Sequence, residues 1–130
     1  MSRIYRKSNE VDPHGKNPKE SGAKLDVGKD PVVRGAFQYF PRAQRAIADL
    51  SAIGAMKYTW NGWEDVPDGF NRYSEALGRH LLDEAQNGLY DDGEGGTGVL
   101  HATAVAWNAM ARLELLIKEL GGHDGGGKEV

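Results

Sequence analysis

The chain has 130 residues, which corresponds to about one domain. Its net charge of -3 argues against binding to duplex nucleic acid, because a duplex-binding protein needs a basic surface to neutralise phosphates. The sequence contains no cysteine, which excludes disulfides and thiolate metal sites and fits a reducing cytoplasm, and its apolar runs are too short to span a membrane.

The two ends of the sequence are poor in packing residues. Residues 1–30 are polar and contain almost no large apolar side chains, and they lack the apolar core of a signal peptide. We expect residues 1–21 to form a flexible arm, because such a composition buries little apolar surface. Residues 121–130 are rich in glycine, and we expect this tail to be disordered.

Between these ends the sequence predicts three helices. The first covers about residues 41–58, where Pro41 suits the first turn because its missing N–H would have no helical partner there. The second covers about residues 71–86. The third covers about residues 98–120 and is rich in alanine and leucine, which favour helices. The pattern predicts an all-α fold, a small helical bundle over residues 22–120.

The predicted second helix places ionisable residues on its apolar face. At about 100° per residue, Tyr73, Leu77 and Leu81 form an apolar stripe. His80 and Glu84 fall within that stripe. Polar groups are costly to bury without partners, so this imidazole and this carboxylate are candidates for a site.

The predicted third helix has apolar residues on two faces. His101, Asn108 and Arg112 lie nearly in line on the second of these faces. A helix that is apolar on two sides is usually buried between neighbours or in an oligomer interface. We therefore expect an oligomer, in which Asn108 and Arg112 either bridge subunits or belong to a site.

A short acidic linker joins the second and third helices, so we expect these helices to be antiparallel neighbours. His80, Glu84 and His101 should then meet near the acidic loop at residues 91–94. Oxygen donors together with imidazoles suit Mg²⁺ or Mn²⁺, and Zn²⁺ less well. Two alternatives remain open: the histidines bond to the backbone or to each other in a core, and the acidic loop is a solvated turn.

Other candidate residues also have two interpretations. Trp60 and Trp63 either pack under a loop or stack on a nucleobase, as aromatic faces can. Lys24, Lys29 and Lys57 are either surface charges or contacts to phosphate. A binder of single-stranded nucleic acid could use the same residues, but the overall acidity argues against it.

Several short motifs follow one another between residues 22 and 119. They are GAKLDVGK at 22–29, IGAMKY at 53–58 with Gly62-Trp63, Arg72-Tyr73, EALGRHLLDE at 75–84, Asp92, Thr97-Gly98, His101, and AWNAMARLE at 106–114. In this order and spacing they resemble a phage-encoded family, the dATP/dGTP diphosphohydrolase N-terminal domain. That family is similar to the MazG-type all-α pyrophosphohydrolases.

The resemblance implies antiparallel MazG-like helices that assemble as a homodimer or homotetramer. It implies hydrolysis of a purine (deoxy)nucleoside triphosphate, dGTP or dATP, to the monophosphate and pyrophosphate. It also implies Mg²⁺ or Mn²⁺ held by side chains of two neighbouring helices. In a phage, this activity would adjust the nucleotide pool of the host cytoplasm.

The resemblance assigns roles by position. Metal ligation falls to five residues on or between the second and third helices: His80, Glu84, Asp92, His101 and Asn108. His80 and Glu84 would also orient the attacking water. Independently of the resemblance, we expect contact with the substrate from Lys24, Lys57, Trp63, Arg79 and Arg112.

The sequence also departs from the pattern of its relatives. The MazG carboxylate motifs, E-E-x-x-E and E-x-x-D, are absent, and Ala104 stands where relatives often have a second histidine. These departures favour one alternative function, a non-catalytic oligomeric helical interaction module that has lost the metal site.

Overall fold

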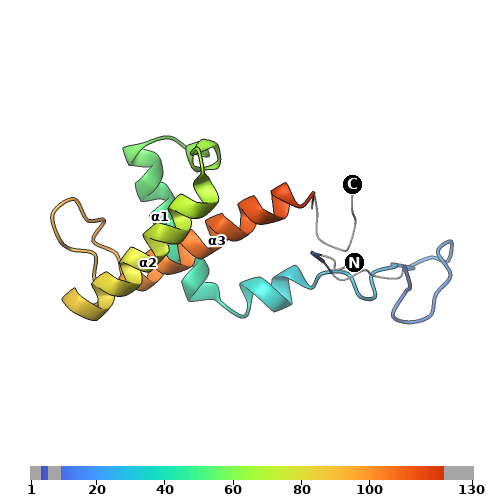
Figure 1. Cartoon of the computed structure of the whole chain (residues 1–130). Coiled ribbons are helices and arrows are strands. Elements are labelled where there is room, and N and C mark those ends of the chain that lie inside the picture. The colour runs from blue at the N-terminus through green and yellow to red at the C-terminus, as the bar shows by residue number, and fades with distance from the viewer. Residues whose placement is uncertain (1–3, 6–9, 122–130) are drawn as a thin grey trace. The chain divides into compact units, whose positions relative to one another are not determined.

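A computed structural model describes residues 4–5 and 10–121 of the chain (Figure 1). Its elements are a π-helix η1 (Val33–Phe37), helix α1 (Pro41–Lys57), a 3-10 helix η2 (Gly62–Asp65), helix α2 (Gly69–Asn87) and helix α3 (His101–Glu119). Within the described ranges there is no β-strand, and the only bridge is an isolated antiparallel one between Tyr90 and Leu100. The predicted all-α class is confirmed.

The chain divides into two compact units, one of Tyr39–Leu116 and one that groups Met1–Gln38 with Ile117–Val130. The first contains α1, η2, α2 and most of α3, and we call it the helical unit. Most of the predicted tail, residues 122–130, lies outside the described residues. None of the helices in the described ranges is both long and apolar enough to cross a membrane.

The helix ends follow the local sequence. Pro41 occupies the first turn of α1, as predicted. Helix α2 ends at Gly88, which has φ of 104° and donates its N–H to Glu84 O, a conformation that favours glycine. Helix α3 begins three residues later than predicted, because residues 90–100 form a hairpin-like loop in which the N–H of Asp91 donates to Val99 O.

Helices α2 and α3 are antiparallel neighbours, as Figure 1 also shows. His101, at the start of α3, contacts His80 in the second half of α2. At the other end of the pair, Leu115 of α3 packs against Gly69, the first residue of α2. The antiparallel arrangement therefore brings His80 and His101 together at one end of the pair.

An aromatic cluster joins the elements of the helical unit. Trp63, Tyr73 and Trp107 make edge contacts with ring centroids 5.7 to 6.2 Å apart. The Trp107 indole N–H donates to Ser51 Oγ of α1 at 2.9 Å, and the Tyr73 hydroxyl donates to Trp63 O at 2.7 Å. Each aromatic pair of this kind contributes about 0.5–1.5 kcal/mol beyond its buried area. The cluster fixes the segment between α1 and α2 against α3.

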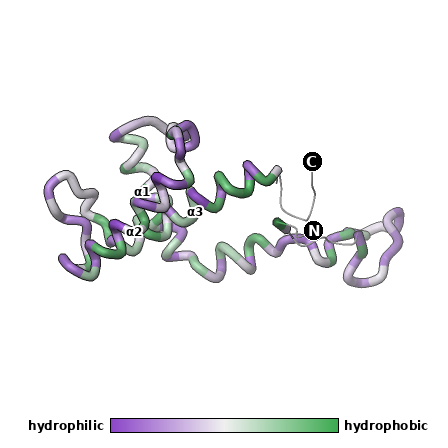
Figure 2. The backbone as a smooth tube through the Cα atoms, viewed as in Figure 1, coloured by the Kyte–Doolittle hydropathy of each residue, from purple (hydrophilic) through white to green (hydrophobic). Residues whose placement is uncertain are grey.

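The apolar core is small. Among the described residues, only Ala104 and Ala111 are buried apolar residues, and both lie on α3. Figure 2 shows hydrophobic residues recurring along α3 between hydrophilic ones. Larger apolar side chains on α2 and α3 are exposed in the single chain, including Leu82 of α2 and Met110 and Leu113 of α3.

In the other unit, residues 11–27 form a loop around one carboxylate, and we call it the Asp12 loop. Asp12 is only 5% exposed and accepts the backbone N–H groups of His14, Lys16 and Lys24. The N–H of Lys24, and then those of His14 and Lys16, hold the pKa of Asp12 below its ordinary value despite burial. The Asp12 loop includes residue 21, at which we expected the flexible N-terminal arm to end. The boundary between arm and domain stays a prediction.

Candidate functional site

Two histidines face each other where α2 and α3 meet. His80 is half-buried and His101 is only 3% exposed, and their Nδ1 atoms are 3.0 Å apart. The backbone N–H of His101 donates to Leu89 O at 2.8 Å, which fixes the start of α3. Without another partner, one of these nitrogens must donate a proton to the other.

A carboxylate from the linker completes the group. Asp91 is half-buried, and ligand atoms of His80, Asp91 and His101 all lie within 4.8 Å of one another. Partial burial raises the pKa of Asp91, but two hydrogen bonds from Thr97 and the electrostatic effect of the neighbouring His80 and His101 outweigh it, so the pKa is lowered. The carboxylate is therefore anionic at neutral pH.

The three side chains fit a divalent metal ion. Two imidazoles with one carboxylate are a common donor set for first-row transition metals, and Mn²⁺ accepts both donor types. Two nitrogens at about 2.1 Å from one ion are roughly 3.0 Å apart when the two bonds meet at a right angle, and roughly 3.4 Å apart at the tetrahedral angle. The two Nδ1 atoms, at 3.0 Å, lie at the short end of this range. Within the described ranges no other group of three such ligands occurs.

The structure separates the other predicted ligands from this group. Glu84 is half-buried on α2, one turn beyond His80, and Asp92 is exposed; neither belongs to the group. Asn108 is buried, and its side-chain amide donates to Ala104 O at 2.8 Å within α3. Of the acidic loop at residues 91–94, Asp91 belongs to the group, and Asp92, the ligand expected from the sequence, does not.

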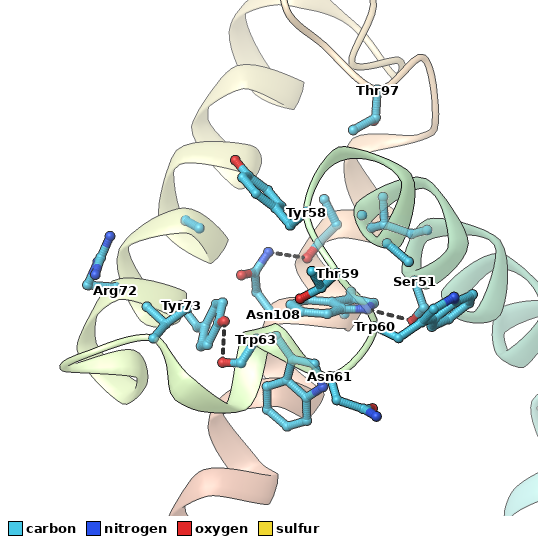
Figure 3. A pocket seen from close by; sticks show the side chains of 18 of the residues that line it. Ser51, Tyr58, Thr59, Trp60, Asn61, Trp63, Arg72, Tyr73, Thr97 and Asn108 are labelled. Carbon is cyan, nitrogen blue, oxygen red and sulfur yellow. Dashed lines mark hydrogen bonds between the residues drawn. The ribbon is translucent and has the colours of Figure 1, made fainter.

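A pocket of about 830 Å³ lies beside the group of His80, Asp91 and His101, which we call the candidate metal group. Its walls come from the end of α1, the segment between α1 and α2, and the facing sides of α2 and α3 (Figure 3). His80 and Thr97 line it, so the candidate metal group forms part of its wall. Its aromatic and basic lining consists of Tyr58, Trp60, Trp63, Arg72, Tyr73, Arg79 and Trp107.

Of the predicted substrate residues, Trp63 and Arg79 line the pocket. The other three are not among its lining residues. Lys57 Nζ lies 5.3 Å from the centre of the Tyr58 ring. Arg112 donates from Nε to Ser74 Oγ at 2.8 Å, and its guanidinium lies 4.5 Å from the centre of the Phe70 ring. Lys24 belongs to the Asp12 loop.

Two residues that the sequence analysis left out of its site assignment also face the pocket. Trp60 is 68% exposed there, and Arg72 donates to Pro67 O at 3.2 Å while lining the same space. The sequence leaves both Trp60 and Trp63 as candidates for stacking on a base. The exposure of Trp60 distinguishes it from Trp63, which packs in the aromatic cluster.

These features define an all-α protein with a histidine and carboxylate group at the wall of an aromatic pocket. Residues 19–124 match the family model for dATP/dGTP diphosphohydrolase, N-terminal. The chain therefore belongs to this family, which confirms the resemblance seen in the sequence motifs. No curated protein and no solved structure matches the chain.

Proposed function

We propose that this protein hydrolyses a purine deoxynucleoside triphosphate, dGTP or dATP, to the monophosphate and pyrophosphate, with Mn²⁺ or Mg²⁺ as cofactor. One observation carries the proposal: His80 belongs to the group of His80, Asp91 and His101 and also lines a pocket of about 830 Å³. That volume lies within the roughly 300–1,000 Å³ typical of small-molecule sites. The family membership of the chain supports the same reaction.

The metal would be held by His80, Asp91 and His101. When bound, it would neutralise triphosphate charge and polarise the phosphorus under attack. Two imidazoles favour Mn²⁺ over Mg²⁺, because Mg²⁺ prefers oxygen ligands. Both Nδ1 atoms must be free of a proton to bind a cation. Metal binding would therefore replace the hydrogen bond that joins them.

The pocket residues would hold the substrate. The exposed face of Trp60 offers a stacking surface for a purine. Arg72 and Arg79 line the same pocket and would bind phosphate oxygens through charge-assisted hydrogen bonds. Glu84, one turn beyond His80, stays our candidate for orienting the attacking water and accepting its proton.

Product analysis tests the proposed reaction. The protein is incubated with each of the eight common NTPs and dNTPs and with Mn²⁺ or Mg²⁺, and the products are separated by chromatography. Monophosphate and pyrophosphate from dGTP or dATP would support the proposal. Diphosphate and phosphate would contradict the cleavage position, and no turnover with any substrate would refute the proposed activity.

A second candidate function is a non-catalytic oligomeric interaction module without metal. Two considerations favour it: the buried Ala104 stands where the family resemblance leads us to expect a histidine, and the hydrogen bond between His80 and His101 gives both Nδ1 atoms a partner without an ion. Thermal unfolding separates the two candidates. A catalytic metal centre predicts an increase in Tm with Mn²⁺, and the module predicts none.

We also propose that the protein assembles as a homodimer or homotetramer. The helical unit buries few apolar residues, and helices α2 and α3 expose several large apolar side chains: Leu81, Leu82, Met110 and Leu113. Covering such surfaces is a main driving force for association. Light scattering tests this proposal, and a mass near 14.2 kDa would contradict it.

A further inference from the structure

The linker that carries Asp91 forms a closed loop over residues 88–100, and we call it the Asp91 loop. The N–H of Asp91 donates to Val99 O, and the N–H of Gly98 donates to Asp91 O, both at 2.7 Å. The bridge between Tyr90 and Leu100 closes the base of the loop. The backbone of Asp91 is therefore held on both sides by residues from the far end of the loop.

The side chain of Asp91 is held as well. Oδ2 accepts the backbone N–H of Thr97 at 3.0 Å and its hydroxyl at 3.0 Å. A single residue thus supplies two donors to one carboxylate oxygen. A carboxylate has about four lone-pair sites, so two such hydrogen bonds leave acceptor capacity for a cation.

The loop also needs close contact between Asp91 and Gly96. A Cβ atom on Gly96 would overlap Asp91 O and lie 2.9 Å from Asp91 Oδ1. The nearer atom belongs to the backbone, so any side chain at position 96 would displace Asp91. At Gly93, in the same loop, a Cβ atom would meet nothing within 4 Å.

We propose that Thr97 is a positioning residue for metal binding, which orients the Asp91 carboxylate toward His80 and His101, and that Gly96 permits the close approach this requires. This inference rests on the metal centre proposed above. Ligating carboxylates are commonly oriented by hydrogen bonds from residues that do not touch the metal, and loss of such a partner typically weakens metal affinity 10- to 100-fold.

The first experiment measures Mn²⁺ binding by calorimetry in the full chain without nucleotide. Thr97→Val keeps the backbone N–H and the shape of the side chain but removes the hydroxyl donor, and we expect about ten-fold weaker binding. Thr97→Ser retains the hydroxyl and should bind Mn²⁺ like the wild type. Because Thr97 is exposed, the Tm without metal should be the same for all three proteins.

A second pair of variants tests the close approach. Gly96→Ala should weaken Mn²⁺ binding by at least about ten-fold, because the added Cβ would displace Asp91 from its position beside the histidines. Gly93→Ala is the matched control and should leave the affinity unchanged. Circular dichroism spectra of both proteins should show the same helix content, since the loop lies outside α2 and α3.

The outcomes separate this inference from the proposals it rests on. If the wild type binds no Mn²⁺, the metal centre fails and the positioning role fails with it. If the wild type binds Mn²⁺ and Thr97→Val binds it equally well, or Thr97→Ser is as weak as Thr97→Val, the role of the hydroxyl is overturned and the metal centre stands. Mn²⁺ binding without nucleotide hydrolysis would overturn only the proposed reaction.

Discussion

The Asp12 loop and the Asp91 loop use a carboxylate in two different ways. In both, an aspartate is removed from full solvent exposure, accepts hydrogen bonds from its own loop, and has a lowered pKa. Asp12 accepts three backbone N–H groups spread over both oxygens. Asp91 accepts both of its bonds from Thr97 at one oxygen and has two imidazoles beside it.

This difference distinguishes a structural carboxylate from a candidate ligand. The bonds to Asp12 tie together residues that are distant in its loop, and Asp12 belongs to no group of metal-ligating side chains in the part of the chain that the structure describes. A carboxylate oxygen of Asp91 lies within 4.8 Å of a ring nitrogen of His80 and of His101. Burial and a lowered pKa alone would not distinguish Asp12 from Asp91. The number and origin of their hydrogen-bond donors do.

The largest expected effect comes from replacing Asp91. Asp91→Asn removes the anionic ligand and should weaken Mn²⁺ binding by more than about 100-fold, beyond the effect of losing an orienting partner. Asp92→Asn is the matched control, because it makes the same change one residue away at an exposed position outside the group. Calorimetry with Mn²⁺ compares the two variants, and equal losses would contradict the choice of Asp91.

The neighbouring aspartates also mark the limit of the sequence analysis. Helical spacing and a short linker were enough to predict that His80 and His101 meet, and the predicted helices 41–58 and 71–86 match α1 and α2 within two residues at either end. Which of two adjacent carboxylates turns inward depends on bonds from Thr97 and on contact with Gly96. These contacts exist only in the folded loop, and no periodicity in the sequence encodes them.

Metal-dependent stabilisation should be of intermediate size. Mn²⁺ at about 100 times its Kd should increase the free energy of unfolding of the wild type by about 2.7 kcal/mol, because the ion binds the folded state. Asp91→Asn should lose this increase, whereas Asp12→Asn should retain it. Thermal unfolding with and without Mn²⁺ gives the answer. A loss in both variants would mean that the two loops do not differ as described.

A smaller effect is expected at the pocket arginines that we propose bind phosphate. Arg79→Ala should raise KM for the substrate about ten-fold, the loss of one charge-assisted hydrogen bond. Arg45, an exposed residue of α1 that does not line the pocket, provides the control variant Arg45→Ala. Steady-state kinetics on dGTP and dATP compares them. Neither substitution should alter Mn²⁺ affinity, since neither arginine belongs to the metal group.

The smallest effect is expected at Asp12. The pKa of Asp12 is lowered in the folded chain. Asp12 therefore contributes to the order of the Asp12 loop at pH values above its ordinary pKa of 3.8, and this contribution is lost as the pH falls through the lower pKa of the folded chain. The amide resonances of His14 and Lys24 should titrate with a midpoint below 3.8. In Asp12→Asn that titration should be absent, and Mn²⁺ binding should be unchanged. A midpoint at or above 3.8 would contradict the hydrogen bonds described for this loop.

The pocket contains all three tryptophans of the chain: Trp60, Trp63 and Trp107. Intrinsic fluorescence excited selectively at tryptophan therefore comes entirely from the walls of one site, with no background from elsewhere in the chain. Trp60 is widely exposed, and Trp63 and Trp107 lie in the aromatic cluster. A purine that stacks on Trp60 would quench or shift this emission. Ligand occupancy can thus be followed without a label, in the unmodified protein and at the low concentrations at which an oligomer would dissociate.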